Sequence, residues 1–333
     1  MMNKYLRTGH VLFVLLLLLF VAAVIGTGVD LLAQRRIGRG GQIGRKSPDD
    51  KTPKGLRSIN VNGKKRFYLL HEPSRASAIK KKPVVIMLHG GGGNGEIAQR
   101  QTGFSQKADK EGFIAVFPYG SGRGGDNLLT WNAEGCCAYA MNNSIDDVAF
   151  ISRLIDTLIK DHNADKGRIY AAGHSNGAML SLHLAREMKG KLAGVASVAG
   201  ALFDTSSPPA AGVPVLLIHG EADVMVPMEG GMSGRKQIVQ AQSKPYLPFA
   251  DMVSFWQRHN GCDETPDVIR NGKVTTKRYM NCDDGNGVEV VVVRDGGHAW
   301  PGGKKGHPGS DTPAKELSAT DAAWEFFSRH RKN

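Results

Sequence analysis

The sequence predicts an α/β fold: a single domain with a mostly parallel central sheet and helices on both faces. Apolar runs typical of strands alternate with helical patterns through the middle of the 333-residue chain. Several of these runs, such as residues 83–88, are continuously apolar, as in strands that are buried on both faces. A hydrophobic content of 41% with 22% charged residues is ordinary for a globular protein.

The N-terminal segment has the layout of a secretory signal, because Lys4 and Arg7 precede an unbroken apolar run over 11–25. The uncharged stretch continues to residue 29, a length of 19 residues that is near the lower limit for a membrane span. We therefore expect export to the cell envelope or beyond, with cleavage favoured over retention as an anchor through residues 11–29. The expected organisation is a signal peptide or anchor at 1–33, a disordered basic linker at 34–54 and a folded catalytic domain at 55–333.

The formal net charge is +12, but the first 50 residues hold seven Lys or Arg against three Asp, which leaves +8 on the rest. Residues 80–82, all lysine, form the only dense basic run in the body of the chain. A nucleic-acid partner would need basic residues clustered with aromatic ones, so none is expected. The lysine run is interpreted as a solvated loop, although an acidic polysaccharide or an anionic surface would also suit it.

The individual elements follow from local patterns. Alternating runs at 57–61 and 66–71, separated by Asn62-Gly63, predict a hairpin with a type I′ turn. Ser144 with an acid three positions on predicts a helix start, and this position makes Asp146 and Asp147 complements of the helix dipole rather than a catalytic pair. Further strands are expected at 83–88, 113–117, 192–199, 213–218, 274–279 and 288–293, and further helices at 96–111, 251–260 and 320–330.

The stretch 168–180, RIYAAGHSNGAML, has the pattern of a strand, a sharp turn and a helix. Gly173 and Gly177 flank Ser175 and leave room for a tight strand-to-helix crossing. A serine at the tip of such a turn has a strained backbone that directs its hydroxyl away from the sheet. Ser175 is therefore the candidate nucleophile, although a G-x-S-x-G match alone recurs by chance.

A nucleophilic serine needs a base and an acid that orients the base. Asp223 and His298 each stand five residues past the last apolar residue of an expected strand, where reactive groups of α/β sheets gather. Their order after Ser175 is the order expected for a nucleophile on such an elbow. Glycines around His298 would let its imidazole approach a neighbouring loop. The alternatives after Ser175 are Asp204, Asp251 and Asp295 for the acid, and His183, His219, His259, His307 and His330 for the base.

The glycine run at 90–93 follows an expected buried strand. No Lys-Ser or Lys-Thr follows it, and no dinucleotide-binding G-x-G-x-x-G is present, so a phosphate cradle is disfavoured and no cofactor is expected. We instead expect the backbone amides of Gly91 and Asn176 to form an oxyanion hole. The chain also lacks Cys-x-x-Cys and His-x-x-x-His pairs, so no metal site is expected.

Four cysteines in an exported chain suggest disulfides, with three possible pairings. Cys262 and Cys282 bracket a short segment that begins after a helix and ends in a strand, and we expect them to be bonded. Cys136 and Cys137 are adjacent. They either bond to each other or reach separate partners.

Taken together, seven segments resemble a known family, the secreted esterases grouped as polyhydroxybutyrate depolymerase and feruloyl esterase, in the first carbohydrate esterase family. The segments are LHGGGGN at 88–94, WNAEGCC at 131–137, IDDVAF at 145–150, GHSNGAM at 173–179, HGEADVMVP at 219–227, FWQRHNGC at 255–262 and GGHAWPGG at 296–303. The resemblance implies an α/β-hydrolase fold, a triad of Ser175, Asp223 and His298, and a bond between Cys262 and Cys282.

The resemblance also implies a serine carboxylesterase. Polyester depolymerases usually carry a linker and a binding domain after the catalytic domain, whereas this chain ends with its last expected helix. Feruloyl or acetyl esters of plant polysaccharide, or related soluble esters, are therefore the favoured substrates. A polyester or oligomer hydrolase, a peptidase and a non-catalytic envelope binding protein are the alternatives. Trp131 and Trp300 either pack against an aromatic acyl group or a sugar face, or anchor their loops.

Overall fold

The structure is a computed structural model that describes residues 55–73, 80–306 and 309–332. All of them belong to one compact unit, Pro53–Asn333. The expected leader at 1–33 and linker at 34–54 lie outside the described residues, and so does the apolar stretch at 11–29. Within the described ranges, no helix combines the length and the apolar character that a membrane span requires.

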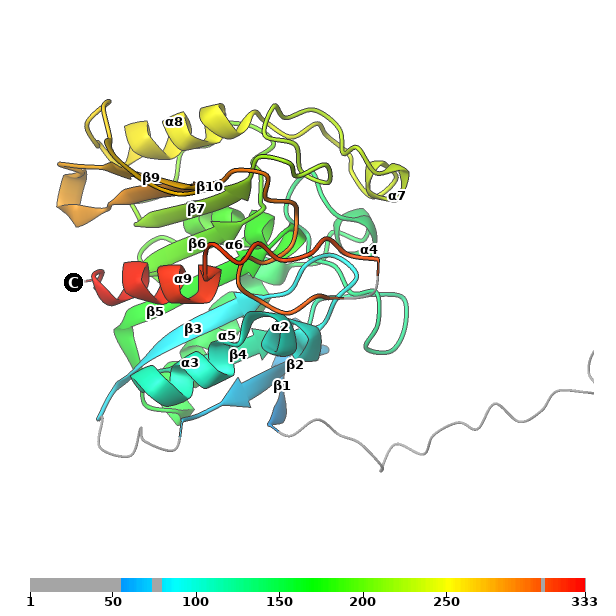
Figure 1. Ribbon diagram of the computed structural model, residues 1–333. Helices are drawn as coiled ribbons and strands as arrows, with labels where there is room; N and C mark the ends of the chain where they lie inside the picture. The colour runs from blue at the N-terminus through cyan, green and yellow to red at the C-terminus, as the bar shows by residue number, and fades with distance from the viewer. Residues whose placement is uncertain (1–54, 74–79, 307–308, 333) are drawn as a thin grey trace, which may run out of the picture. The chain divides into compact units, whose positions relative to one another are not determined.

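The described strands form one ten-stranded sheet in the order β1-β2-β4-β3-β5-β6-β7-β10-β9-β8 (Figure 1). The six strands from β4 to β10 in this order are parallel, and antiparallel pairs flank them on both sides. The predicted α/β class with a mostly parallel centre is therefore confirmed. The strands are β1 (Leu56–Val61), β2 (Lys64–His71), β3 (Lys82–Leu88), β4 (Ile114–Pro118), β5 (Ala164–His174), β6 (Gly194–Val198), β7 (Val215–Gly220), β8 (Asp267–Asn271), β9 (Val274–Tyr279) and β10 (Val288–Val293).

Helices cover both faces of the sheet (Figure 1). They are α2 (Gly95–Thr102), α3 (Phe104–Glu111), α4 (Ala138–Asn142), α5 (Asp147–Asp161), α6 (Asn176–Glu187), α7 (Lys236–Val239), α8 (Phe249–His259) and α9 (Ala319–Ser328), with a 3-10 turn at Asp283–Gly285. Apolar residues of α5, α6 and α8 belong to one core cluster, and those of α2, α3 and α9 to a second. On β3, Val84 and Ile86 join the first cluster while Val85 and Met87 join the second. This arrangement explains why the strand is continuously apolar.

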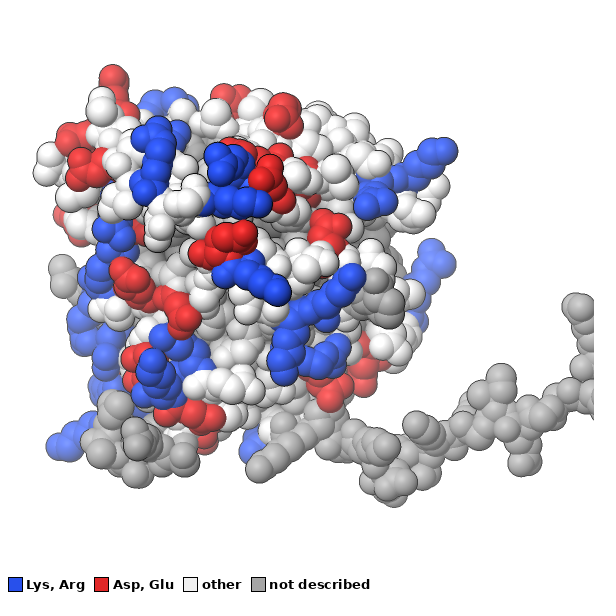
Figure 2. Space-filling model, viewed as in Figure 1, with Lys and Arg blue, Asp and Glu red and all other residues white. Residues whose placement is uncertain are grey.

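Charged side chains of both signs are interspersed on the face drawn in Figure 2. Some of them link the elements beneath. Lys107 on α3 contacts Glu111 at 3.0 Å and Asp321 on α9 at 2.9 Å. Such surface pairs contribute little to stability individually. We therefore attribute the packing of α3 beside α9 mainly to the apolar cluster that they share.

The local turn predictions have mixed outcomes. The hairpin is confirmed, with Asn62 and Gly63 both at positive φ, 50° and 76°, as a type I′ turn requires. The single helix expected over 96–111 is instead two helices, because Gly103 has a φ of 71° and ends α2 before α3 begins. The edge strand β8 has no counterpart among the predicted strands. Its five residues are all exposed, so no buried apolar pattern marks it.

Helix α5 begins two residues later than expected. Asp146, rather than Ser144, is its N-cap and accepts the N–H of Ala149 at 2.8 Å. Asp147 is buried and accepts a hydrogen bond from Arg66 on β2 at 2.7 Å. This buried ion pair joins α5 to the antiparallel end of the sheet, so the aspartate pair has structural roles.

Both cysteine pairs are bonded in the structure. The predicted disulfide between Cys262 and Cys282 is present, and it ties the end of α8 to the segment after β9. Cys136 and Cys137, for which two arrangements were open, are bonded to each other.

Asp146 and Asp147 differ in burial, and we therefore expect their replacement to lower the free energy of unfolding by different amounts. Asp147→Ala leaves the buried Arg66 guanidinium without its carboxylate and the N–H of Asn132 without its acceptor. We expect this variant to lower the free energy of unfolding by about 3 to 5 kcal/mol, whereas Asp146→Ala, which removes only a helix cap, costs about 1 kcal/mol. Urea unfolding of the two variants measures the difference, and equal losses would contradict the assignment.

Candidate active site

The candidate residues lie in loops that follow four of the six parallel strands in the centre of the sheet. The glycine run at 90–93 follows β3, Ser175 follows β5, Asp223 follows β7 and His298 follows β10. The carboxyl ends of parallel strands meet at one edge of the sheet. Segments separated by more than 100 residues in the sequence are thereby brought to one place.

The turn at Ser175 is held by close contacts between backbones. Ser175 has φ 55° and ψ −123°, and its N–H donates to the carbonyl of Val198 at 2.9 Å. A Cβ at Gly173 would overlap the carbonyl oxygen of Gly177, and a Cβ at Gly177 would overlap that of Leu88. Both positions therefore require glycine, and the crossing presses the start of α6 against the end of β3.

Asp223 and His298 form a buried hydrogen-bonded pair. His298 Nδ1 donates to Asp223 Oδ2 at 2.7 Å. The other carboxylate oxygen accepts the N–H groups of Met225 and Val226 at 2.8 and 2.9 Å. Burial by itself would raise the pKa of Asp223, but the neighbouring His298 imidazole and the donated hydrogen bonds hold the pKa below its ordinary value.

The loops that carry this pair are joined to each other and to the elbow. The N–H of Ala222 donates to the carbonyl of Gly296 at 2.8 Å, which ties the loop after β7 to the loop after β10. The N–H of His298 donates to Asp311 Oδ2 at 2.8 Å, and its carbonyl accepts from His174 Nε2 at 2.7 Å. The backbone on both sides of the His298 side chain is therefore held in place.

His219, one of the alternative bases, lies on the far side of Asp223 and does not line the cavity. Its Nε2 donates to the carbonyl of Val226 at 2.8 Å and stands 3.6 Å from Asp223 Oδ2. Burial lowers the pKa of His219, which keeps the ring neutral. Its Nδ1 is buried and has no hydrogen-bond partner among the described residues. The ring supports the turn that holds the acid.

The two expected oxyanion donors lie beside each other. A Cβ at Gly91 would stand 3.6 Å from the Cβ of Asn176, and one at Gly90 would stand 3.5 Å from that of Ser175. Across the described loops and helix ends, neither the Gly91 nor the Asn176 N–H has a protein acceptor. The glycine run is therefore in contact with the elbow, with both amide donors available.

His89 holds the start of this glycine run. Its Nδ1 donates to the carbonyl of Gly90 at 2.8 Å, and its Nε2 accepts the N–H of Gly120 at 2.9 Å. This pair of bonds requires the neutral ring, and burial lowers the pKa of His89 to about 4. The sequence analysis did not select His89, because its place beside the glycines was visible but its partners were not.

Neither tryptophan reaches the cavity, so the expected packing against a substrate is not what the structure provides. Trp131 is 0% exposed and donates from Nε1 to the carbonyl of His89 at 2.9 Å. Trp300 is 2% exposed and donates from Nε1 to Thr320 Oγ1 at 3.0 Å. Both rings are buried and anchor their loops, which is the second of the two interpretations that the sequence left open.

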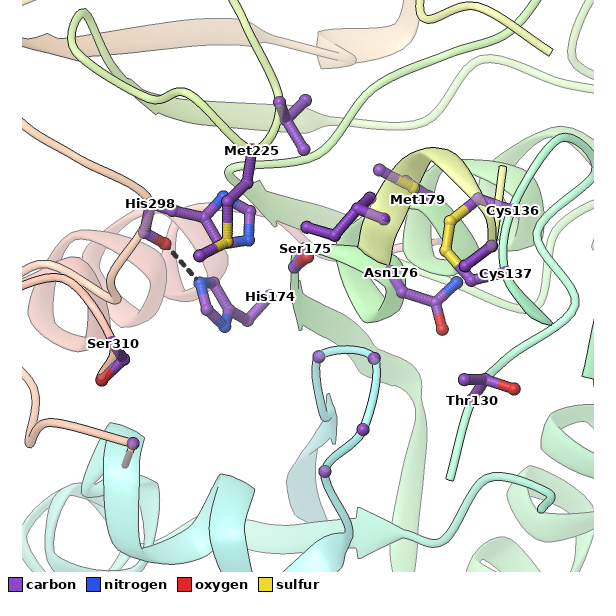
Figure 3. A pocket seen from close by; sticks show the side chains of 18 of the residues that line it. Thr130, Cys136, Cys137, His174, Ser175, Asn176, Met179, Met225, His298 and Ser310 are labelled. Atoms are coloured by element: carbon purple, nitrogen blue, oxygen red, sulfur yellow. Dashed lines mark hydrogen bonds between the residues drawn. A yellow bond between two sulfur atoms is a disulfide. The ribbon is translucent and has the colours of Figure 1, made fainter. Parts of the chain in front are cut away.

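A cavity of about 580 Å³ opens beside Ser175 and His298 (Figure 3). The long loop at 120–143 contributes lining residues, among them Leu128 and the bonded pair Cys136 and Cys137. The segment 228–248 contributes others, which are Gln237, Ile238, Ala241 and Tyr246. Within the described chain, no lysine or arginine lines this cavity. Asp311 is the one acidic residue among the described lining residues, so the cavity disfavours an anion and suits a largely apolar group without negative charge.

Two buried imidazoles make stability sensitive to acid. Burial lowers the pKa of His89 and of His174 from 6.5 to about 4. The unfolded chain therefore binds more protons than the folded protein between pH 6.5 and 4, and the free energy of unfolding falls as the pH drops through this window. From pH 7 to pH 5 we expect a loss of about 2 kcal/mol per imidazole.

Denaturant unfolding of the wild type and of His89→Gln and His174→Gln at both pH values measures this effect. Each variant should show a shallower dependence on pH, because glutamine does not titrate. The same slope in all three proteins would contradict the assignment.

The sequence and the fold both match known proteins. Residues 74–252, more than half of the chain, match the family described as phospholipase/carboxylesterase. NocK of Nocardia uniformis subsp. tsuyamanensis, a protein named as an esterase, is 32% identical over 289 residues, which cover 81% of each chain. Feruloyl esterase B of Piromyces equi is 29% identical over 249 residues, which cover 72% of this chain and 44% of that one.

Among solved structures, the acetyl xylan esterase from Aspergillus awamori superposes with a TM-score of 0.57 at 14% identity. The superposition covers 82% of this chain and 98% of that one, and it shows a shared fold. These three findings agree. The chain belongs to the phospholipase/carboxylesterase family, has the α/β-hydrolase fold and is a carboxylic ester hydrolase.

Proposed function

We propose that this esterase uses Ser175 as nucleophile, His298 as general base and acid, and Asp223 as the group that orients His298. The observation that carries the proposal is the 2.7 Å hydrogen bond from His298 Nδ1 to Asp223 Oδ2, at a cavity that Ser175 also lines. Because Nδ1 carries its proton toward Asp223, the opposite nitrogen, Nε2, is the one available to accept a proton.

The first half of the reaction forms an acyl-enzyme. Ser175 Oγ attacks the ester carbonyl carbon while its proton passes to His298 Nε2. Negative charge then develops on the carbonyl oxygen, which the amides of Gly91 and Asn176 stabilise by about 3 kcal/mol each. The bond to the alcohol oxygen breaks, and that oxygen takes the proton from His298.

The second half repeats these steps with water. His298 Nε2 removes a proton from a water molecule, which attacks the acyl carbonyl, and the same amides stabilise the second tetrahedral intermediate. The acid is released as Ser175 Oγ regains its proton. Asp223 stabilises the transient imidazolium in both halves and stays ionised throughout. The hydrogen bonds that lower its pKa support this role.

We propose feruloyl or acetyl esters of plant polysaccharide, or related soluble esters, as substrates. The relatives named feruloyl esterase and acetylxylan esterase support this class. The chain spans less than half the length of both of these relatives, so the support concerns the ester bond rather than the whole polymer. A cavity of about 580 Å³, with Asp311 as the one acidic residue and no basic residue among its described lining, is large enough for an aromatic acyl group.

We also propose that the protein is exported. The basic and then apolar start of the chain is typical of a secretory signal, although it lies outside the described residues. The two disulfides support an oxidising compartment.

Removing a member of the triad should abolish turnover. We expect Ser175→Ala and Asp223→Asn to lower kcat/KM for p-nitrophenyl acetate by at least about 10³-fold. Asp251→Asn is the matched control, because Asp251 is an exposed aspartate in the first turn of α8. It should stay within about twofold of the wild type. Wild-type turnover by Ser175→Ala would show that the proposed nucleophile is wrong.

The substrate class is tested by hydrolysis of methyl ferulate, acetylated xylan and a polyhydroxybutyrate suspension side by side. We expect release of ferulate or acetate from the first two and little release of soluble acid from the suspension, because the reacting serine lies at a cavity that accepts one acyl group at a time. Faster release from the suspension than from both soluble esters would favour a polyester depolymerase instead.

A further inference from the structure

The disulfide between Cys136 and Cys137 is part of the cavity wall, and the proposed mechanism does not use it. Both residues line the same cavity as Ser175. They stand in a tight turn, in which the N–H of Ala133 donates to the carbonyl of Cys136 at 2.8 Å and the N–H of Cys137 donates to that of Trp131 at 3.1 Å. Cys136 is 0% exposed and Cys137 is 7% exposed, so the disulfide is embedded in the wall and Cys137 is the half with surface open to the cavity.

The position of the disulfide relative to His298 identifies which part of an ester it meets. The leaving alcohol takes its proton from His298, so the alcohol must occupy the His298 side of Ser175. Figure 3 shows the disulfide together with Met179 on the opposite side of Ser175 from His298. The carbonyl carbon carries the alcohol oxygen on one side and the rest of the acyl chain on the other. The acyl chain therefore extends away from His298, toward the disulfide.

The surroundings on that side are apolar and firmly attached. Met179 and Ala241 line the cavity with the disulfide, and sulfur atoms pack favourably against apolar and aromatic groups. The N–H of Ala138 donates to the carbonyl of Ala241 at 2.9 Å, and the N–H of Ser243 donates to that of Gly135 at 2.9 Å. These bonds join the disulfide turn to the segment that carries α7, so the wall is held from two sides.

We propose that the Cys136–Cys137 disulfide is the wall of the acyl-binding half of the site and determines selectivity for the length of the acyl chain. This inference rests on the proposed function of Ser175 and His298. An uncharged acyl chain of several carbons packs its far end against the Cys137 half of the disulfide, whereas an acetyl group is too short to do so. The alcohol does not meet the disulfide.

The experiment uses the full chain carrying Cys262→Ala and Cys282→Ala, so that Cys136–Cys137 is the only disulfide left. Its folding is checked by near-ultraviolet circular dichroism. The probes are p-nitrophenyl phosphonates with a methyl or a hexyl group on phosphorus. Ser175 Oγ forms a bond to phosphorus, p-nitrophenolate leaves, and the alkyl group stays where an acyl group would lie. Labelling rates are measured before and after reduction with a phosphine. The phosphine takes the oxygen atom of a water molecule and becomes the phosphine oxide, and the two hydrogens of that water protonate the two thiols.

Reduction should lower the ratio of the hexyl to the methyl labelling rate several-fold. When Cys136→Ala and Cys137→Ala are added to this chain, the ratio should be lower by about fourfold, because the lost sulfur contact is worth roughly one buried methylene group. In that chain the phosphine should no longer change the ratio. A ratio that neither reduction nor substitution alters would overturn the proposal. Methyl acetate and hexyl acetate, which differ only in the alcohol, are compared in the same chains. The proposal would also be overturned if reduction or substitution changed the relative hydrolysis rates of these two esters and left the labelling ratio unchanged.

The phosphonates also separate this inference from the proposed function. If Ser175 is labelled but the protein hydrolyses no ester, the proposed function is wrong and the labelling ratio still decides the role of the disulfide. If neither phosphonate labels Ser175 in the folded protein, both proposals are overturned.

Discussion

The close crossing of β5 and α6 is the contact on which the rest of the site depends. At Gly173 and Gly177 the two backbones approach so closely that neither position has room for a Cβ. Because these contacts involve backbone atoms, no side chain can move to relieve them. They press the start of α6 against the end of β3, which brings Asn176 beside Gly91. The left-handed φ of Ser175 and the closeness of Gly91 to Asn176, the proposed oxyanion donors, are thus consequences of one crossing.

The parallel centre of the sheet supplies the remaining groups. Strands β7 and β10 are paired so that their last residues lie side by side, and the loops that follow them therefore begin next to each other at the carboxyl edge of the sheet. Backbone hydrogen bonds between these loops then hold His298 Nδ1 at 2.7 Å from Asp223 Oδ2. His298 is held on three sides, by Asp223 at its ring, by Asp311 at its N–H and by His174 at its carbonyl. An imidazole that is fixed in this way loses little conformational freedom when substrate binds, which suits the role proposed for His298.

Three further histidines surround the site as neutral hydrogen-bonding groups. Burial lowers the pKa of His89, His174 and His219, so that their rings carry no charge near neutral pH. A second cation beside His298 would oppose the imidazolium that the proposed acyl transfer forms. The neutral rings of His174 and His219, which neighbour His298, therefore hold their loops without placing a charge next to the proposed base. The buried rings lower the free energy of unfolding at acid pH, because the folded protein does not bind the protons that the unfolded chain binds.

The sequence by itself determined the alternation of strands and helices, the Asn62-Gly63 turn and the placement of Ser175, Asp223 and His298 after three strands, because apolar period, glycine and chain order are local properties. The exposed strand β8 has no such pattern, and it was missed for that reason. Only the tertiary structure decided what each loop meets. It buried Trp131 instead of leaving it at the cavity, and it placed the cysteine pair beside Ser175. The partner of a side chain depends on which distant segments come together, and no local pattern encodes that.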